Sequence, residues 1–188
     1  GIFTLVSIAK NLTWEKVNSY DKNQLRSLEV SDAASRIAKI EPLRKELINF
    51  QREFTKIKLN GYNGSILDGR DIGTIILPNA DFKFFLDAKP EVRAKRRTQE
   101  LIELNYKSIY QEVLDDLIKR DERDKLREVS PLIRSDDAFY IDTTLKSMDE
   151  IVEIALDFIK ENNLTQNIII LSMYSPNKKN CKKFLNNI

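Results

Sequence analysis

Histidine is absent from the 188-residue sequence, and cysteine occurs once, as Cys181. The lack of histidine excludes Ser-His-Asp and Cys-His catalysis, together with every zinc site that needs an imidazole ligand. A single cysteine cannot form an internal disulfide, which is compatible with a reducing compartment. The chemistry of this protein must therefore come from other side chains.

Long apolar runs and a large excess of one charge are also missing. No run of about 18 apolar residues is present, which argues against a membrane-spanning helix. The start of the chain, residues 1–6, lacks the basic region and cleavage site of a signal peptide, so we expect a cytoplasmic protein without a membrane partner. These residues also lack an initiating Met and are typical of the middle of a helix, so we expect the chain to be incomplete at its front.

The charge balance is nearly even. Thirty-one Lys and Arg against 29 Asp and Glu leave a net charge of +2. A strongly basic nucleic-acid-binding module is therefore disfavoured, and we expect no nucleic-acid partner.

Short apolar segments alternate with amphipathic ones along the chain. We expect strands at 65–67, 82–86 and 138–141, with 168–171 as a candidate fourth, and irregular structure at 11–26. We expect helices from Ser31, from Pro42, after Pro90, over 109–127 and from Ser147, the last opened by a capping box. This alternation favours an α/β fold with a parallel sheet.

Glycine is scarce: four of the five glycines lie between Gly61 and Gly73. In an open α/β sheet, ligands bind beyond the carboxyl ends of the strands, and residues 68–73 follow such a strand directly. Here Gly69 permits close backbone approach, Arg70 offers a planar fork of donors suited to phosphate, and Asp71 can accept from an exocyclic amine. A glycine-rich turn with a surface Arg–Asp pair explains the spacing equally well.

The same stretch imitates a phosphate-binding Walker A loop. Its two glycines, Gly64 and Gly69, have the spacing of G-x-x-x-x-G-K-[ST], but Arg70 and Asp71 stand where Lys and Ser/Thr are required. A carboxylate there would repel the phosphates, so we reject this interpretation.

Two arginine-rich helices follow. Arg120, Asp124 and Arg127 are spaced i, i+4 and i+7 and share one helical face. By spacing alone they form a solvated ladder of ion pairs, each of which stabilises the helix by about 0.3–0.5 kcal/mol. However, Arg93 and Arg97 share a face on the preceding helix, and arginine suits bidentate contacts to phosphate. Together the two helices favour recognition of a phosphoryl group.

In combination, these segments resemble bacterial cytidylate kinases, and the match covers roughly residues 1–161 in family order. The matching segments are 25–35, 68–74, 93–97, 120–124 with Arg127, 130–132, 136–138 and 141–144. The resemblance implies a P-loop-kinase-like, three-layer α/β/α fold with a parallel sheet. It also implies transfer of the γ-phosphoryl group of ATP to CMP or dCMP, a step of pyrimidine-nucleotide metabolism. ATP would arrive with Mg²⁺, and we expect no metal bound by the protein itself.

The resemblance also implies roles for individual residues. Ser35, Arg44 and Asp71 would read the cytosine edge, and a uracil, with an acceptor at position 4, would face Asp71 unfavourably. The CMP phosphate would be held by Arg70 and Arg127, and the sugar hydroxyls would contact Arg120 and Asp124. Arg93 and Arg97 would reach the ATP base and its transferring phosphate, and the catalytic group would comprise Arg97, Arg120 and Arg127.

The sequence departs from the family pattern at its front. The family begins with a strand, a Walker A loop and a helix, followed by an Asp-Ser-Gly-x-x-Tyr-Arg segment, and these residues hold neither motif. We therefore expect a fold without the first strand, Walker A loop and first helix, and little or no kinase activity of this chain alone. Residues 1–163 would form one incomplete nucleoside-monophosphate kinase domain, monomeric if complete. Within it, a CMP-binding insert would span about 11–60 and a lid about 98–130, and residues 164–188 would be an appended basic tail.

Two alternatives remain open at this point. The first is a non-catalytic CMP-binding or regulatory remnant of such a kinase. The second is an RNA-binding protein that uses the arginine helices, which the near-neutral charge disfavours.

Overall fold

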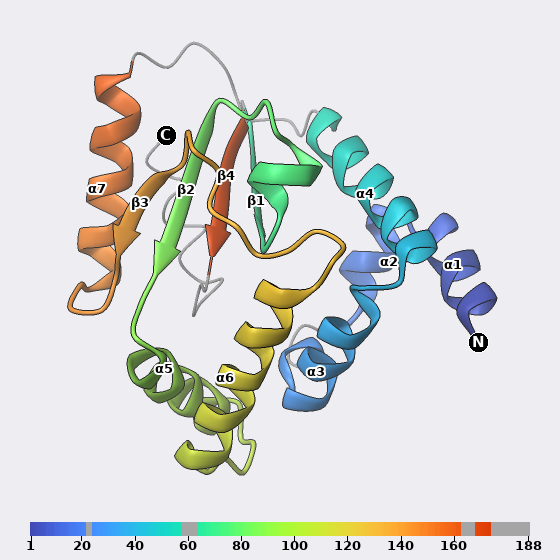
Figure 1. The fold of residues 1–188 in the computed structure, drawn as a ribbon, viewed down its shortest axis with the longest axis horizontal. Helices are drawn as coiled ribbons and strands as arrows, with labels where there is room; N and C mark the ends of the chain where they lie inside the picture. Colours follow the sequence, from blue (N-terminus) through green and yellow to red (C-terminus); the bar gives the residue numbers. More distant parts are fainter. Residues whose placement is uncertain (22–23, 58–63, 163–167, 174–188) are drawn as a thin grey trace.

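The computed structural model describes residues 1–21, 24–57, 64–162 and 168–173 (Figure 1). These residues form a parallel sheet of four strands, β1 (Ser65–Gly69), β2 (Phe82–Asp87), β3 (Phe139–Asp142) and β4 (Ile168–Met173), in the order β1-β4-β2-β3. The expected α/β class with a parallel sheet is confirmed. Cys181 lies outside the described residues.

Seven α-helices and two shorter helical turns accompany the sheet within these ranges. They are α1 (Ile2–Lys10), α2 (Trp14–Ser19), η1 (Gln24–Arg26), α3 (Leu28–Ile37), α4 (Glu41–Lys56), the π-helical turn η2 (Ile72–Ile76), α5 (Pro90–Glu103), α6 (Tyr110–Leu126) and α7 (Met148–Glu161). Among the helices that the structure describes, none combines the length and apolarity needed to cross a bilayer.

Two expectations about the first 40 residues are wrong. The helix expected from Ser31 begins at Leu28, because Ser27 adopts an extended backbone and its side chain accepts from the Val30 amide at 3.2 Å. The stretch 11–26, expected to be irregular, contains α2 and η1. Helix α2 is capped in the same way, by the side chain of Thr13.

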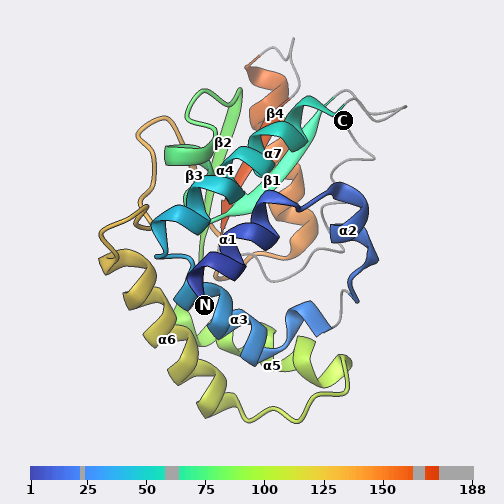
Figure 2. The same ribbon diagram turned by 90° about the vertical axis from the view of Figure 1, so that its right-hand side faces the viewer.

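Helices cover both faces of the sheet. Successive strand residues point to opposite faces, and accordingly Ile66 and Leu67 of β1 belong to different apolar clusters. The Ile66 cluster joins β2 and β3 to α7, whereas the Leu67 cluster joins η2 to Ile48 and Phe54 of α4. On this second face of the sheet, α1 packs against α4 (Figure 2). The layers are therefore α/β/α.

Helices α5 and α6 lie beyond the carboxyl ends of β2 and β3 (Figure 1). They pack against each other through a cluster centred on the buried residues Ala94, Leu101 and Val113. Because β1 is parallel to the other strands, its carboxyl end faces the same side. The residues that follow β1 and β2 therefore come together with those on α6.

Strand β4 lies between β1 and β2 and pairs with both. Its register places Ile170 opposite Leu67 on one side, and Leu171 opposite Phe84 on the other. The strand expected at 168–171 is confirmed and extends to Met173. The division of the chain at residue 163, the insert and the lid stay predictions.

Helix α7 begins with the expected capping box, which carries a testable stability effect. Ser147 Oγ accepts from the Glu150 amide at 3.3 Å, and the Glu150 carboxylate accepts from the Ser147 amide at 2.7 Å. Ser147→Ala is expected to lower the free energy of unfolding by about 1 kcal/mol, as loss of an N-cap usually does. Urea unfolding followed by circular dichroism measures this change. Ser147→Asp retains an acceptor and should stay close to the original chain; an equal loss in both variants would contradict the capping role.

Candidate functional site

Asp124 lies at the centre of the site, near the end of α6, with 2% of its surface exposed. Its carboxylate accepts from Ser35 Oγ of α3 at 3.2 Å. Three guanidinium groups surround the same carboxylate: Arg70 Nε at 3.3 Å, Arg120 Nε at 3.8 Å and Arg127 Nη1 at 3.8 Å. The structure thus brings together residues from α3, from the end of β1 and from α6. The interpretation of Arg120, Asp124 and Arg127 as a solvated ladder is wrong, because Asp124, the partner of both arginines, is buried.

A second ion pair lies in the same region. Arg44 Nη2, from the first turn of α4, contacts Asp71 Oδ2, and both side chains are largely buried. Arg44 also donates to Ser130 Oγ at 2.9 Å and to the Ala38 carbonyl at 3.1 Å. These partners hold the Arg44 guanidinium in one orientation before any ligand binds.

The turn after β1 explains why Arg70 and Asp71 lie here. A Cβ atom added to Gly69 would lie 2.8 Å from Ile72 Cγ1 and 2.9 Å from its Cδ1. Because real Cβ atoms do not approach so closely, any larger residue at this position would force the Ile72 side chain, which is 1% exposed, to shift. Asp71, 6% exposed, is the residue that precedes η2. The interpretation of this segment as a surface Arg–Asp pair is wrong, since each residue bonds to a different buried partner.

The site has an excess of positive charge. The ion pairs of this group join four arginines, Arg44, Arg70, Arg120 and Arg127, to two carboxylates, Asp71 and Asp124, so arginines outnumber carboxylates among them. Burial lowers the pKa of the Arg120 guanidinium, and the charge of Arg70 lowers it further, whereas Asp124 opposes the change. Burial also lowers the pKa of Arg127, again opposed by Asp124. An anionic ligand would relieve this repulsion.

Two donors of the cluster are buried without a hydrogen-bond partner among the described residues. They are Arg120 Nε and Arg127 Nη2. Buried polar groups are nearly always hydrogen-bonded, and each exception calls for an explanation. The planar donor fork of arginine matches the oxygens of a phosphate group. These two atoms therefore favour a phosphate-bearing ligand.

Ser130 also belongs to the site, although the sequence indicated no role for it. It has a positive φ of 52°, a left-handed conformation that is uncommon outside glycine. Its hydroxyl accepts from Arg44 Nε, and its carbonyl accepts from Arg127 Nε. Ser130 thereby joins the two ion-pair groups. Its position directly before Pro131, which disfavours the right-handed helical conformation, is the available sequence signal.

Arg93 and Arg97 lie on α5, outside the cluster around Asp124. Arg93, 7% exposed, donates to the Ala88 carbonyl at 2.9 Å and to Asp121 Oδ2 at 2.6 Å, so it links the start of α5 to α6. Arg97 pairs with Glu100 at 2.7 Å, and its charge contributes to lowering the pKa of Arg120. Arg97 is thus near enough for its charge to act on Arg120.

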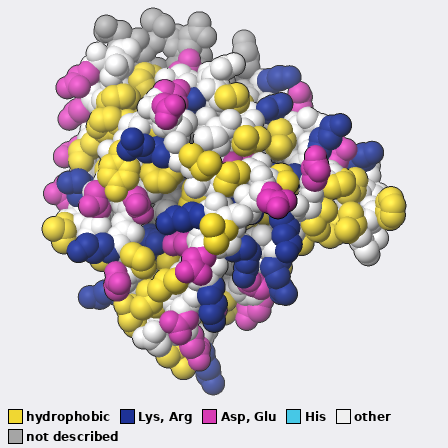
Figure 3. Space-filling model, viewed as in Figure 1, with side chains coloured by type: hydrophobic (Ala, Val, Ile, Leu, Met, Phe, Trp, Pro, Cys, Tyr) yellow, Lys and Arg dark blue, Asp and Glu magenta, His cyan; other side chains and the backbone are white. Residues whose placement is uncertain are grey.

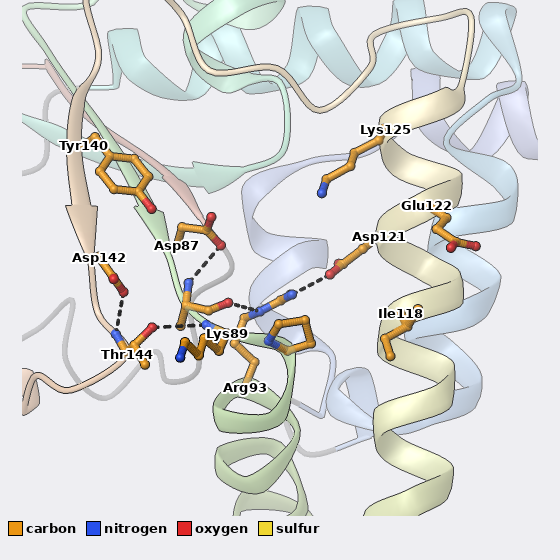
Figure 4. A pocket seen from close by; sticks show the side chains of 12 residues that line it. Asp87, Lys89, Arg93, Ile118, Asp121, Glu122, Lys125, Tyr140, Asp142 and Thr144 are labelled. Atoms are coloured by element: carbon orange, nitrogen blue, oxygen red, sulfur yellow. Dashed lines mark hydrogen bonds and ion pairs between the residues drawn. The ribbon is translucent and has the colours of Figure 1, made fainter.

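Arg93 lines a groove with a volume of about 420 Å³ at the carboxyl ends of β2 and β3 (Figure 4). The walls come from the turn after β2, from α6 and from the end of β3. Their residues include Asp87, Lys89, Asp121, Lys125, Tyr140 and Thr144. In Figure 4 the Arg93 guanidinium lies between the turn and α6, held at both ends by the contacts just described. Within the described ranges, no three acidic or thiol side chains lie close enough together to hold a metal ion.

Charged side chains of both signs are interspersed on the face shown in Figure 3. This mixture agrees with the net charge of +2. The positive charge that matters to the site is thus the buried arginine group and not a broad basic surface.

A parallel α/β sheet with buried arginine donors beyond its carboxyl edge is typical of proteins that bind phosphorylated small molecules. The model of the cytidylate kinase family matches residues 6–161, and the chain belongs to this family. The resemblance noted from the motifs is therefore confirmed.

Curated relatives agree with the family assignment. The chain is 45% identical to a cytidylate kinase of Clostridioides difficile over 130 residues, which cover 69% of this chain and 58% of that protein. It is 43% identical to a cytidylate kinase of Bartonella bacilliformis over 143 residues, covering 76% of this chain and 65% of the relative. Cytidylate kinase 1 of Haemophilus influenzae is 40% identical over 141 residues, which cover 75% of this chain and 59% of that protein. The chain thus spans less than two thirds of the length of these relatives.

Proposed function

We propose that this chain forms the CMP-binding side of a cytidylate kinase, which transfers the γ-phosphoryl group of ATP to CMP or dCMP and yields CDP or dCDP. The observation that carries the proposal is the pair of buried, unpartnered donors, Arg120 Nε and Arg127 Nη2, beside the fixed Arg44–Asp71 pair. Arg127 Nη2 suits a phosphate, Arg120 Nε suits the sugar beside it, and the Arg44–Asp71 pair suits a nucleobase edge. All three lie at the end of a sheet where such ligands bind.

The phosphate of CMP would be held by Arg70 and Arg127. Arg127 Nη2 supplies a donor that no described residue occupies. Because the surroundings of Arg127 exclude most water, a charge-assisted bond there is stronger than one at the surface. Arg120 and Asp124 would contact the sugar hydroxyls, with Asp124 as the acceptor.

The base would be read by Asp71, Ser35 and Arg44. Asp71 and Ser35 can accept from the 4-amino group of cytosine, and Arg44 can donate to the acceptor side of the ring. Uracil would bring its O4 acceptor against the Asp71 carboxylate, leaving both groups unpaired. Because Arg44 is already fixed by Ser130 and the Ala38 carbonyl, little ordering is needed when the base binds.

The ATP side would use Arg93 and Arg97. The contacts of Arg93 with Ala88 and Asp121 hold its guanidinium plane in place at the groove, where it can stack on a base. Mg²⁺ would be bound chiefly through the ATP phosphates and water. Arg97, Arg120 and Arg127 would stabilise the charge of the transferring group. In-line transfer needs positioning and positive charge and no covalent protein intermediate.

Titration calorimetry with CMP and with cytidine tests the phosphate assignment. Arg127→Ala is expected to weaken CMP binding about 10- to 100-fold, the range for a lost bond to a charged group, and to leave cytidine binding nearly unchanged. Arg36→Ala is the matched control, because Arg36 is an exposed arginine paired with Asp32. An equal loss for CMP and cytidine would show that Arg127 supports the fold instead of binding the phosphate.

An ADP-release assay with CMP and Mg·ATP tests the activity of the 188-residue polypeptide itself. None of its residues forms a G-x-x-x-x-G-K-[ST] motif, whose amides and lysine hold the ATP phosphates. We expect this polypeptide to bind CMP with little or no turnover. Ordinary turnover would show that other residues of the chain hold the triphosphate.

A further inference from the structure

Lys83 is a buried lysine in the middle of the sheet. It lies on β2, and only 5% of its side chain is exposed. Burying an ammonium group is costly unless it is paired and hydrogen-bonded, so lysine is rarely found at such positions. The proposed function assigns no role to Lys83, nor to its partner Asp137 in the family-like segment 136–138.

The contacts of Lys83 join two segments that are distant in the sequence. Its ammonium donates to the carbonyl of Pro78, just beyond the end of η2, and to Asp137 Oδ2 at 2.6 Å. Its aliphatic stem lies against the start of η2. A Cβ atom added to Gly73 would be 3.3 Å from Lys83 Cδ and 3.5 Å from Ser135 Oγ. Lys83 therefore touches both ends of η2 and the segment before β3.

Both segments lead directly to the site around Asp124. The first, η2, begins immediately after Asp71, the partner of Arg44. The second, residues 130–138, begins at Ser130, which accepts from Arg44 and from Arg127, and its Leu132 amide donates to the Asp124 carbonyl at 2.7 Å. The Lys83 side chain is a physical link between these two segments, in addition to Arg44, which bonds to Asp71 and Ser130. The hydrogen bond from Lys83 lowers the pKa of Asp137 and so favours its charged form.

We propose that Lys83 is a positioning residue, which through Pro78 and Asp137 holds η2 and residues 130–138 in the relative position that base recognition by Asp71 and Arg44 requires. The proposal rests on the proposed function, because it concerns the same CMP site. Lys83 itself does not touch the ligand in this proposal, and its effect passes through the two segments.

Lys83→Met tests this role, since it retains most of the stem and removes the ammonium. Two results are expected. Backbone amide hydrogen exchange, followed by mass spectrometry, becomes faster in residues 72–77 and 130–138 and stays unchanged in α7. The dissociation constant for CMP rises about tenfold, which corresponds to about 1.4 kcal/mol, and the preference for CMP over UMP falls, because the orientation of Asp71 is relaxed.

Lys160→Met is the matched control. Lys160 forms an ion pair with Asp157 at 3.5 Å on α7, and both side chains are about 70% exposed (71% and 68%). Its exchange rates and CMP affinity should equal those of the original chain. Should Lys83→Met fail to fold, Asp137→Asn serves instead, because Asp137 is 62% exposed and its replacement disturbs the core less. It is expected to act in the same direction with a smaller effect.

Each outcome decides one of the two proposals. Unchanged exchange in both segments overturns the role of Lys83, whether or not CMP binds. Faster exchange with an unchanged CMP-to-UMP ratio also overturns it, because Lys83 would then serve stability alone. Failure of the original chain to bind CMP overturns the proposed function instead, and the exchange comparison still decides whether Lys83 holds the two segments.

Discussion

Asp124→Asn is expected to lower the free energy of unfolding by about 3–5 kcal/mol, the usual cost of removing one partner from a buried ion pair. Asp124 is 2% exposed and is the common partner of Arg70, Arg120 and Arg127. Without its charge, three guanidinium groups would repel one another around a neutral amide. Urea unfolding at pH 7, followed by circular dichroism, measures the change.

The control for Asp124→Asn is Asp157→Asn, which removes an exposed carboxylate from α7 and should change stability little. Inorganic phosphate should restore part of the stability lost in Asp124→Asn, because an anion can replace the missing charge among the arginines. A loss below about 1 kcal/mol, the range of surface ion pairs, would contradict the buried character of the cluster.

Asp71→Asn is expected to weaken CMP binding about 100-fold and to abolish the preference for CMP over UMP. A loss of about 100-fold is expected because buried polar groups of the site would be left without their partners. An asparagine can present its amide as a donor to the O4 atom of uracil, whereas the carboxylate can only accept. Calorimetric titration of both nucleotides provides the affinities and hence their ratio.

Asp115→Asn is the control for this variant, because Asp115 is an exposed residue of α6 that accepts from Gln111 and lies outside the site. It should retain both affinities. If Asp71→Asn weakened CMP and UMP equally, the role of Asp71 would be to hold Arg44 and not to read the base.

Much of the fold was predictable because its signals are local. Apolar runs between turn residues identified β1, β2 and β3, and the capping box at Ser147 identified the start of α7. The start of α3 was not predictable, since serine is a favoured N-cap residue and both Ser27 and Ser31 could have served as the cap. The choice between them depends on which residues pack against α6, and that is a long-range contact.

The residues of the candidate site likewise divide into those that local sequence signals predicted and those that depend on tertiary contacts. The sequence by itself determined that Arg70 and Asp71 follow a strand, because the apolar run 65–67 leads directly into them. It also determined that Arg120, Asp124 and Arg127 share a face, because helices repeat every 3.6 residues. Only the tertiary structure decided that the Asp124 and Arg127 side chains on this face are buried, with 3% and 7% of their surface exposed.

The remaining features depend on contacts between distant residues. Ser35 and Asp124 are 89 residues apart, and Lys83 and Asp137 are 54 apart. Arg93 and Arg97 look equivalent in the sequence, yet Arg93 pairs with Asp121, 28 residues away, whereas Arg97 pairs with its helical neighbour Glu100. Turns and helical faces are determined within a few residues, whereas burial and pairing of charges depend on how the elements pack against one another.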